Sequence, residues 1–248
     1  PKLESSGWGR ELVRREHFYR RDVQYTAGRI VLHGDRAHHR EGRKIDYLLR
    51  YTDSLPLAIV EAKEEGLSAE TGLEQAKAYA KDLSVPFAFS TNGHNIIEFD
   101  FFTLDSRNID HFPTPDELWH RWMINTGLRS PGIAQNRASY SLDDATDRRQ
   151  NPLLYPYCPE TITGKSIRYF QEAAINQVIR RIVKGQKRIL LAMATGTGKT
   201  FTAMQVVWKL IKSGWLQRQH PDRPGRILFL ADRVVLRDQA YNAFSTFA

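Results

Sequence analysis

The sequence predicts an α/β protein in which a mixed sheet is followed by part of a parallel sheet. Short apolar runs bounded by Gly, Pro or Asn punctuate residues 1–112, and one helical segment lies among them. Residues 161–248 alternate between helical and strand patterns, which is typical of a parallel sheet with crossover helices. Residues 113–160 are rich in Pro, Asn, Asp, Arg and Ser and are expected to form a helical or extended linker. The chain is therefore expected to have three parts, 1–112, 113–160 and 161–248.

The first part contains both alternating and continuous apolar runs. Residues 44–51 alternate between the two faces of a strand, whereas Leu57 to Val60 is a continuous apolar run that predicts a central strand covered on both faces. Residues 69–83 carry Ala, Glu, Gln, Lys and Leu, which favour a helix. Further strands are predicted at 28–34, 86–90 and 95–99, the last two joined by a turn at Asn92-Gly93.

The rest of the chain carries clear helix signals. Thr114 is a candidate N-cap followed by Pro115, so a helix is expected through about Asn125, with a connector at 127–155. Beyond it the pattern predicts helices and buried strands in alternation. The helices are expected at 169–183, at 200–213 and from 235 onward, and the strands at 188–193 and 226–231.

Composition excludes several classes of protein. Of 248 residues, 41% are apolar and 26% charged, which suits a globular chain and excludes collagen-like or wholly disordered proteins. No apolar run approaches the roughly 18 residues that span a bilayer, so no membrane association is expected. Cys158 is the one cysteine, which excludes an internal disulfide and favours a reducing, cytoplasmic location. The net charge of +8 favours a polyanionic partner, most simply nucleic acid.

A glycine-rich segment between a predicted strand and a predicted helix indicates a phosphate-binding loop. Glycines let backbone N–H groups approach phosphate oxygens at the positive end of the helix. Lys199 would reach the β and γ phosphates of ATP, and the Thr200 hydroxyl would ligate Mg²⁺. The usual pattern has Gly where this chain has Met193. The predicted ATP-binding residues of the loop are Thr195, Gly196, Thr197, Gly198, Lys199 and Thr200.

Together with this loop, Gln171 upstream and Asp232-Arg233 downstream resemble the motor domains of superfamily-two helicases and translocases, which have a RecA-like fold. The resemblance implies that Gln171 reads the adenine edge of ATP and that Asp232 and Arg233 face the nucleic-acid strand. The acidic motif that polarises the attacking water is absent, as is a second motor lobe. We therefore expect the chain alone to lack efficient ATP turnover.

Acidic and basic side chains end two strands of the first part. Asp46 lies in one strand, and Glu61 and Lys63 lie on one face at the end of the next. If these strands form a hairpin, Asp46 and Glu61 come side by side and can hold Mg²⁺. Lys63 would then position a water or neutralise the transition state. This is the arrangement that metal-dependent phosphodiester cleavage requires.

These residues, with Gln75 and Tyr79 one turn apart on the predicted helix, resemble the PD-(D/E)xK nuclease core and its Q-x-x-x-Y extension. The resemblance implies that Asp46 and Glu61 bind metal, that Lys63 is catalytic, and that Gln75 and Tyr79 contact DNA or support the site. Later Ser90 to Gly93 and Glu98 to Asp100 fit the same pattern. The family often adds an acid from its first helix, for which Glu4, Glu11 and Glu16 are the nearby acids.

A nuclease core joined to a helicase-like motor is similar to the restriction (R) subunit of type I restriction–modification enzymes. The resemblance implies Mg²⁺-dependent cleavage of double-stranded DNA coupled to ATP-driven translocation, with modification and specificity subunits as partners. Two alternatives stay open. The chain could be a helicase fragment whose first domain binds DNA or docks subunits without cleaving, or part of a type III-like or orphan nuclease–helicase fusion.

Overall fold

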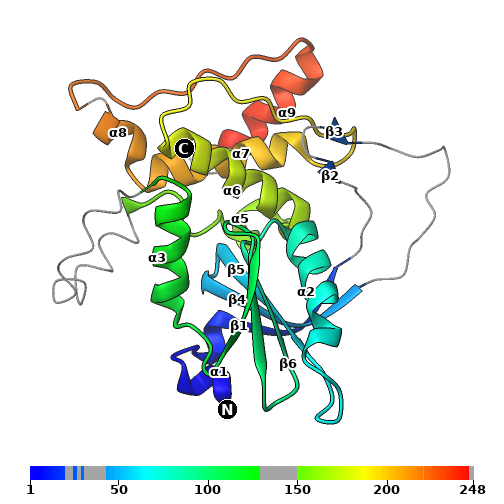
Figure 1. Cartoon of the computed structure of the whole chain (residues 1–248). Coiled ribbons are helices and arrows are strands. Elements are labelled where there is room, and N and C mark those ends of the chain that lie inside the picture. Colours follow the sequence, from blue (N-terminus) through cyan, green and yellow to red (C-terminus); the bar gives the residue numbers. More distant parts are fainter. Residues whose placement is uncertain (20–24, 27–28, 31–42, 129–149, 220, 246–248) are drawn as a thin grey trace. The chain divides into compact units, whose positions relative to one another are not determined.

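The structure is a computed structural model that describes residues 1–19, 25–26, 29–30, 43–128, 150–219 and 221–245 (Figure 1). The chain divides into two compact units, Pro1–Pro131 and Gly132–Ala248, and each is described by itself. The finer division into 1–112, 113–160 and 161–248 remains a prediction. Part of the predicted strand at 28–34 and most of the connector at 127–155 lie outside the described residues.

The first unit is built on a six-stranded mixed sheet, as expected. Its strand order is β1-β4-β5-β6-β7-β8. Only β5 and β6 are parallel, because α2 connects them as a crossover, and all other neighbours are antiparallel. The strands are β1 Val13–Tyr19, β4 Arg43–Thr52, β5 Leu55–Ala62, β6 Phe87–Thr91, β7 Ile96–Asp100 and β8 Asp105–Ile109, and a separate two-stranded sheet comprises β2 Tyr25–Thr26 and β3 Arg29–Ile30.

The prediction of a buried central strand at 57–60 is confirmed, since these four residues of β5 are at most 1% exposed. Helix α2, Glu70–Leu83, covers one face of the sheet, where Leu73 packs in a cluster with Ile97 of β7. Helix α3, Pro115–Asn125, lies on the opposite side (Figure 1). The short helices α1, Lys2–Ser5, and η1, Arg10–Leu12, precede β1.

Helix α3 begins where the sequence predicts. The Thr114 hydroxyl accepts a hydrogen bond from the Glu117 N–H at 3.2 Å, and the Glu117 carboxylate accepts one from the Thr114 N–H at 2.9 Å. This reciprocal cap satisfies two N–H groups that a helix start would otherwise leave without partners. An ion-pair network then attaches α3 to the sheet. Arg121 donates to buried Glu98 of β7 at 2.5 Å and to Asp100 at 2.6 Å.

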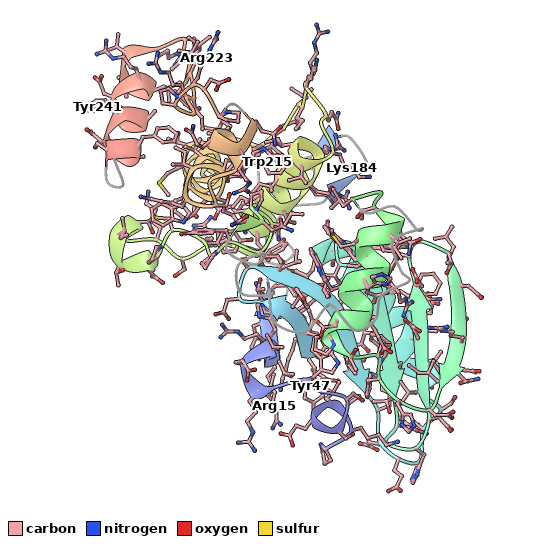
Figure 2. The ribbon with its side chains drawn as sticks, turned by 90° about the vertical axis from the view of Figure 1, so that its left-hand side faces the viewer. Arg15, Tyr47, Lys184, Trp215, Arg223 and Tyr241 are labelled. Carbon is pink, nitrogen blue, oxygen red and sulfur yellow. The ribbon has the colours of Figure 1, made fainter. Side chains whose placement is uncertain are left out.

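The second unit is helical among its described residues. Its elements are α5 Glu160–Thr163, α6 Tyr169–Val183, α7 Lys199–Lys212, α8 Trp215–Gln219 and α9 Val234–Ser245. Figure 2 marks Lys184 just after α6, Trp215 at the start of α8 and Tyr241 on α9. The side chain of Gln205 on α7 binds both the N–H and the C=O of Cys158, at 2.8 and 3.3 Å. The segment before α6 is thereby attached to α7.

The prediction of buried strands at 188–193 and 226–231 is wrong for the structure described here. Neither segment is a strand, and their apolar side chains are exposed: Leu190 is 91% exposed, and Leu228 and Leu230 are each 81% exposed. The physical reason is that a strand exists only by hydrogen bonding to a neighbouring strand, and neither segment has one. The parallel sheet expected for this part is thus absent from the described residues. No described helix is long and apolar enough to cross a bilayer.

Candidate active site

Two carboxylates meet where β4 and β5 pair. The antiparallel register places Tyr47 opposite Val60, so the next step along both strands sets Asp46 across from Glu61. Asp46 Oδ2 accepts a hydrogen bond from the Ala62 N–H at 2.8 Å, which fixes its carboxylate beside the end of β5. A hairpin connecting successive strands therefore brings together two acids that are 15 positions apart in the sequence.

Glu61 is the buried member of this pair. It is 3% exposed, and its Oε2 atom has no hydrogen-bond partner among the described residues. Burial raises the pKa of Glu61 above its ordinary value, and the nearby charge of Asp46 raises it further, whereas Lys63 acts in the opposite direction. A buried carboxylate oxygen without a partner is costly, and a cation bound beside it would offset that cost.

Lys63 connects the carboxylates to helix α2. Its backbone N–H donates to Thr91 C=O at 2.8 Å, so the backbone remains hydrogen-bonded to β6 one residue beyond the end of β5. Its Nζ donates to Glu61 Oε1 at 3.2 Å and to Gln75 Oε1 at 2.9 Å, and Gln75 Nε2 donates to the Tyr79 hydroxyl at 2.8 Å. The structure thus joins the predicted residues Glu61, Lys63, Gln75 and Tyr79 through hydrogen bonds, with Asp46 alongside.

The donor set fits a hard cation that keeps several water ligands. Asp46 and Glu61 offer carboxylate oxygens, which Mg²⁺ prefers, and Mg²⁺ usually takes only one or two carboxylates from a protein. In the part of the chain that the structure describes, no three His, Cys, Asp or Glu side chains gather to hold a metal ion. The candidate third acids therefore do not join the pair. Glu16 lies on β1 in an ion pair of 2.7 Å with Lys44, and Glu4 binds Arg10 at 3.4 Å.

Two other acidic positions that fit the sequence pattern lie elsewhere. Phe89 pairs with Glu98, whereas Ser90 pairs with both Glu61 and Ile97. Because neighbouring residues of a strand point to opposite faces, Glu98 lies on the α3 side and Glu61 on the α2 side. The carboxylates of Glu98 and Asp100 both accept hydrogen bonds from Arg121, and Arg107 also donates to Glu98 at 2.8 Å. Their role is to hold α3.

The sequence did not reveal a polar cluster at the far end of α2. The Tyr19 hydroxyl donates to Asp82 Oδ2 at 2.8 Å, and the rings of Tyr19 and Tyr79 meet edge to face at 5.9 Å. Arg43 lies over the Tyr79 ring at 5.8 Å and 3.7 Å from Asp82 Oδ2. Burial and Asp82 both raise the pKa of Tyr19. These residues come from β1, β4 and α2, so no short-range pattern could have grouped them.

The second unit forms the predicted glycine-rich loop, and its described residues contain no sheet beside it. Gly196 and Gly198 have φ of +80° and +84°, a region that favours glycine, and α7 begins at Lys199. Lys199 Nζ donates to the carbonyls of Met193 and Ala194, both at 3.2 Å, and Thr197 Oγ1 donates to Ala194 C=O at 2.6 Å. Thr195 lies within this loop, and Thr200 is the second residue of α7.

Gln171 of α6 is held against this loop. Its Nε2 donates to Thr197 C=O at 2.9 Å, and its Oε1 accepts from the Arg168 N–H at 3.0 Å. Asp232 and Arg233 behave differently. They form an exposed turn before α9, with 3.9 Å between Arg233 Nε and Asp232 Oδ2. The structure thus brings Gln171 to the loop and leaves Asp232 and Arg233 on the surface.

Comparisons with known proteins match two family models to two separate stretches of the chain. Residues 10–113 match the family described as type I restriction enzyme R protein N terminus, and residues 164–248 match the type III restriction enzyme res subunit family. The chain is 35% identical over 98% of its length to the EcoAI type I restriction enzyme endonuclease subunit of Escherichia coli, covering 27% of that protein. It is 30% identical over 80% of its length to the EcoKI endonuclease subunit of Escherichia coli strain K12, covering 18% of it.

A solved structure is similar as well. It is described as a fragment of an HsdR subunit of a type I restriction enzyme from Vibrio vulnificus YJ016, and it aligns with a TM-score of 0.73 and 36% identity. The alignment covers 95% of this chain and 40% of that one. The chain thus spans about a quarter of the EcoAI subunit, and its similarity extends across both units. It belongs to the family of R subunits of type I restriction enzymes and corresponds to their N-terminal region.

Proposed function

We propose that this chain is the part of a type I restriction endonuclease subunit that cleaves double-stranded DNA with Mg²⁺ and binds the ATP that drives translocation. The proposal rests on the hydrogen-bonded chain of Glu61, Lys63 and Gln75, with Asp46 of β4 held beside it by the Ala62 N–H. This arrangement supports a nuclease over a passive DNA-binding domain, because a buried carboxylate beside a second acid and a lysine has a cost that a purely structural domain has no reason to retain.

In this proposal Asp46 and Glu61 hold Mg²⁺, with water completing the coordination. The bound metal would lower the pKa of a coordinated water and neutralise charge that develops on the scissile phosphate. Lys63 stands 3.2 Å from Glu61 Oε1, close enough to orient a water or to donate to a phosphate oxygen. Gln75, held by the Tyr79 hydroxyl, keeps Lys63 Nζ in that position through its 2.9 Å hydrogen bond.

DNA would approach the site along the edge strand β1. Arg14, Arg15 and Lys44 are exposed there, and Figure 2 shows Arg15 next to Tyr47, its partner in the β1–β4 register. Such side chains neutralise backbone phosphates without reading sequence. The choice of sequence is then left to the specificity subunit, which we propose as a partner together with the modification subunit.

The second unit is proposed to bind ATP through Thr195 to Thr200 as part of a RecA-like motor. Lys199 would exchange its carbonyl contacts for the β and γ phosphates, and the Thr200 hydroxyl would ligate the Mg²⁺ of the nucleotide. Gln171 is already held at the loop by its hydrogen bond to Thr197 C=O. From there it would recognise the adenine edge of ATP. Asp232 and Arg233 are free to meet the nucleic-acid strand because both are exposed.

The test uses the full-length R subunit assembled with its partner subunits, because the chain alone spans only part of its relatives. Glu61→Gln and Lys63→Met should each lower the rate of DNA cleavage by about 10² to 10³-fold. ATP hydrolysis should stay near the wild-type rate, because the phosphate loop lies in the other unit. Glu64→Gln, an exposed acid next to Lys63, is the matched control and should cleave normally. Normal cleavage by Glu61→Gln and Lys63→Met would refute the nuclease assignment.

A further inference from the structure

Gly72 occupies a position in the first turn of α2 where glycine is not needed for backbone conformation. Glycine costs helix stability relative to alanine, and the φ angle at Gly72 is not in the left-handed region that favours glycine. Glycine at a helical position without such a need indicates close approach of another group. The reason for Gly72 is therefore to be found in what lies next to it.

Two side chains fill the space where a Cβ at position 72 would lie. An added Cβ would overlap Ser90 Oγ and would stand 2.9 Å from Lys63 Cε and 3.1 Å from Lys63 Cγ. Real Cβ atoms essentially never come as close as 2.9 Å to another heavy atom. The stem of Lys63 thus lies in a slot between α2 and β6, which we define by Gly72 on one side and Ser90 on the other.

The two side chains that face Gly72 differ in how far they can move. Ser90 is fully buried on β6, between β5 and β7, so its Cβ is fixed by the sheet. Lys63 has a flexible stem, and only its Nζ is held, by Glu61 and Gln75. A side chain at position 72 would therefore displace the Lys63 stem rather than the strand, and Nζ would leave one or both of its partners.

We propose that Gly72 is a positioning residue that sets where Lys63 Nζ stands relative to Glu61 and Gln75. Its missing side chain leaves the slot through which the Lys63 stem reaches both partners. The inference rests on the proposed function for its catalytic consequence, but the placement of Lys63 can be measured without cleavage. It predicts that filling the slot impairs the lysine while leaving the carboxylate pair intact.

The test separates displacement of Lys63 from simple misfolding. Gly72→Ala alone would also collide with Ser90 Oγ, so the informative variant is Gly72→Ala/Ser90→Ala, compared with Ser90→Ala as its parent. The matched control is Gly66→Ala, because a Cβ at Gly66 meets nothing within 4 Å and its φ is not left-handed. Thermal melting of each variant establishes that it is folded.

The first readout is NMR of the 248-residue chain with labelled lysine. The Lys63 ε-CH₂ resonance is assigned by its loss in Lys63→Arg. In the parent, adding Gln75→Ala should shift this resonance, because Gln75 accepts the Nζ hydrogen bond. In Gly72→Ala/Ser90→Ala, the slot-filled variant, the resonance should already be shifted, and Gln75→Ala should move it less than it does in the parent. A resonance in its parental position would overturn the proposal.

The second readout is DNA cleavage by the full-length R subunit in its complex, carrying the same substitutions. The slot-filled variant should cleave at least 30-fold more slowly than its parent, while its Mn²⁺ and DNA affinities stay within threefold. A shifted Lys63 resonance with unchanged cleavage would overturn the positioning role. If the wild-type complex also fails to cleave and the resonance still shifts, the placement of Lys63 by Gly72 stands and the proposed nuclease function fails.

Discussion

The two units of the molecule hold the lysines proposed to act in cleavage and in ATP binding in opposite ways. Lys63 Nζ binds side chains from two elements, Glu61 of β5 and Gln75 of α2. Lys199 Nζ binds two backbone carbonyls, Met193 and Ala194, a few positions upstream in its own loop. The first arrangement requires a complete sheet with a helix packed on it, whereas the second requires only a local turn with two left-handed glycines.

This difference explains why the second unit forms its loop although its described residues do not form the expected sheet. The loop conformation depends on Gly196 and Gly198, and Gln171 of α6 fixes it from outside. The nuclease-like site could not form this way, because Asp46 and Glu61 meet only when β4 and β5 pair in register. The two units therefore contrast in how far their sites depend on contacts between residues distant in the sequence.

The largest effect is expected where α3 is attached to the sheet of the first unit. Arg121→Ala removes one charged hydrogen bond to Glu98 and one to Asp100. Glu98 is only 1% exposed. Leaving buried carboxylates short of a partner should lower the free energy of unfolding by about 3 kcal/mol. Urea denaturation measures this value. Arg107→Ala, which removes an exposed partner of the same Glu98, should cost less than about 1 kcal/mol.

If Arg121→Ala were as mild as Arg107→Ala, the first unit would not depend on these long-range contacts, and the contrast would be lost. Lys199→Ala tests whether the loop of the second unit depends only on local contacts. Because Lys199 contacts only its own loop and is exposed, its loss should change stability by less than about 0.5 kcal/mol.

The second prediction concerns the pH dependence of stability at Glu61. Its folded pKa is raised by burial and by Asp46, so ionising it in the folded state is unfavourable. In metal-free buffer this residue should therefore cost stability as pH rises from the usual glutamate pKa of about 4.3 through the raised value. Each unit of pKa shift corresponds to about 1.4 kcal/mol.

Glu61→Gln should remove this dependence, so the difference in unfolding free energy between Glu61→Gln and wild type should grow with pH over that window and then level off. Urea denaturation at a series of pH values measures it. Added Mn²⁺ should reverse the trend for wild type, because the metal binds the ionised carboxylate. A difference that stayed constant with pH would show that Glu61 is not perturbed.

A moderate effect, on ATP affinity, is expected at the phosphate loop. Gln171→Ala removes the hydrogen bond to Thr197 C=O, so the loop loses one external support while its glycines keep their conformation. ATP affinity should fall about tenfold, equivalent to about 1.4 kcal/mol, in titrations with a fluorescent nucleotide. Gln177→Ala, farther along the same helix, is the control and should bind ATP as wild type does. A loss of a thousandfold would mean that the loop is not locally determined.

The sequence predicted elements of the first unit wherever side-chain pattern and local chemistry agree. Thr114 and Glu117 form the expected cap, and the apolar run at Leu57 to Val60 forms the expected buried strand. Two strands of the six-stranded sheet were missed. Residues 13–19 and 105–109 carry mainly charged and polar side chains because they lie at the two edges of the sheet, where one side of the strand faces solvent.

The opposite error arose in the second unit. The apolar runs at 188–193 and 226–231 have the composition of buried strands, yet composition does not supply the hydrogen-bonded neighbour that a strand needs. At the candidate site, spacing grouped Glu61 with Lys63 and Gln75 with Tyr79. Gly72 carries no side chain for a pattern to recognise, and Ser90 looks like any strand residue, so their place beside Lys63 needed the folded structure.

The central claim is that Asp46 and Glu61 form one shared metal site, and calorimetric titration with Mn²⁺ tests it most directly. Wild type, Asp46→Asn and Glu61→Gln are compared, with Glu64→Gln as the exposed-acid control. We predict one binding event in wild type and in Glu64→Gln, lost in both Asp46→Asn and Glu61→Gln. Binding that survives either of these two substitutions, or no binding in wild type, would contradict the claim.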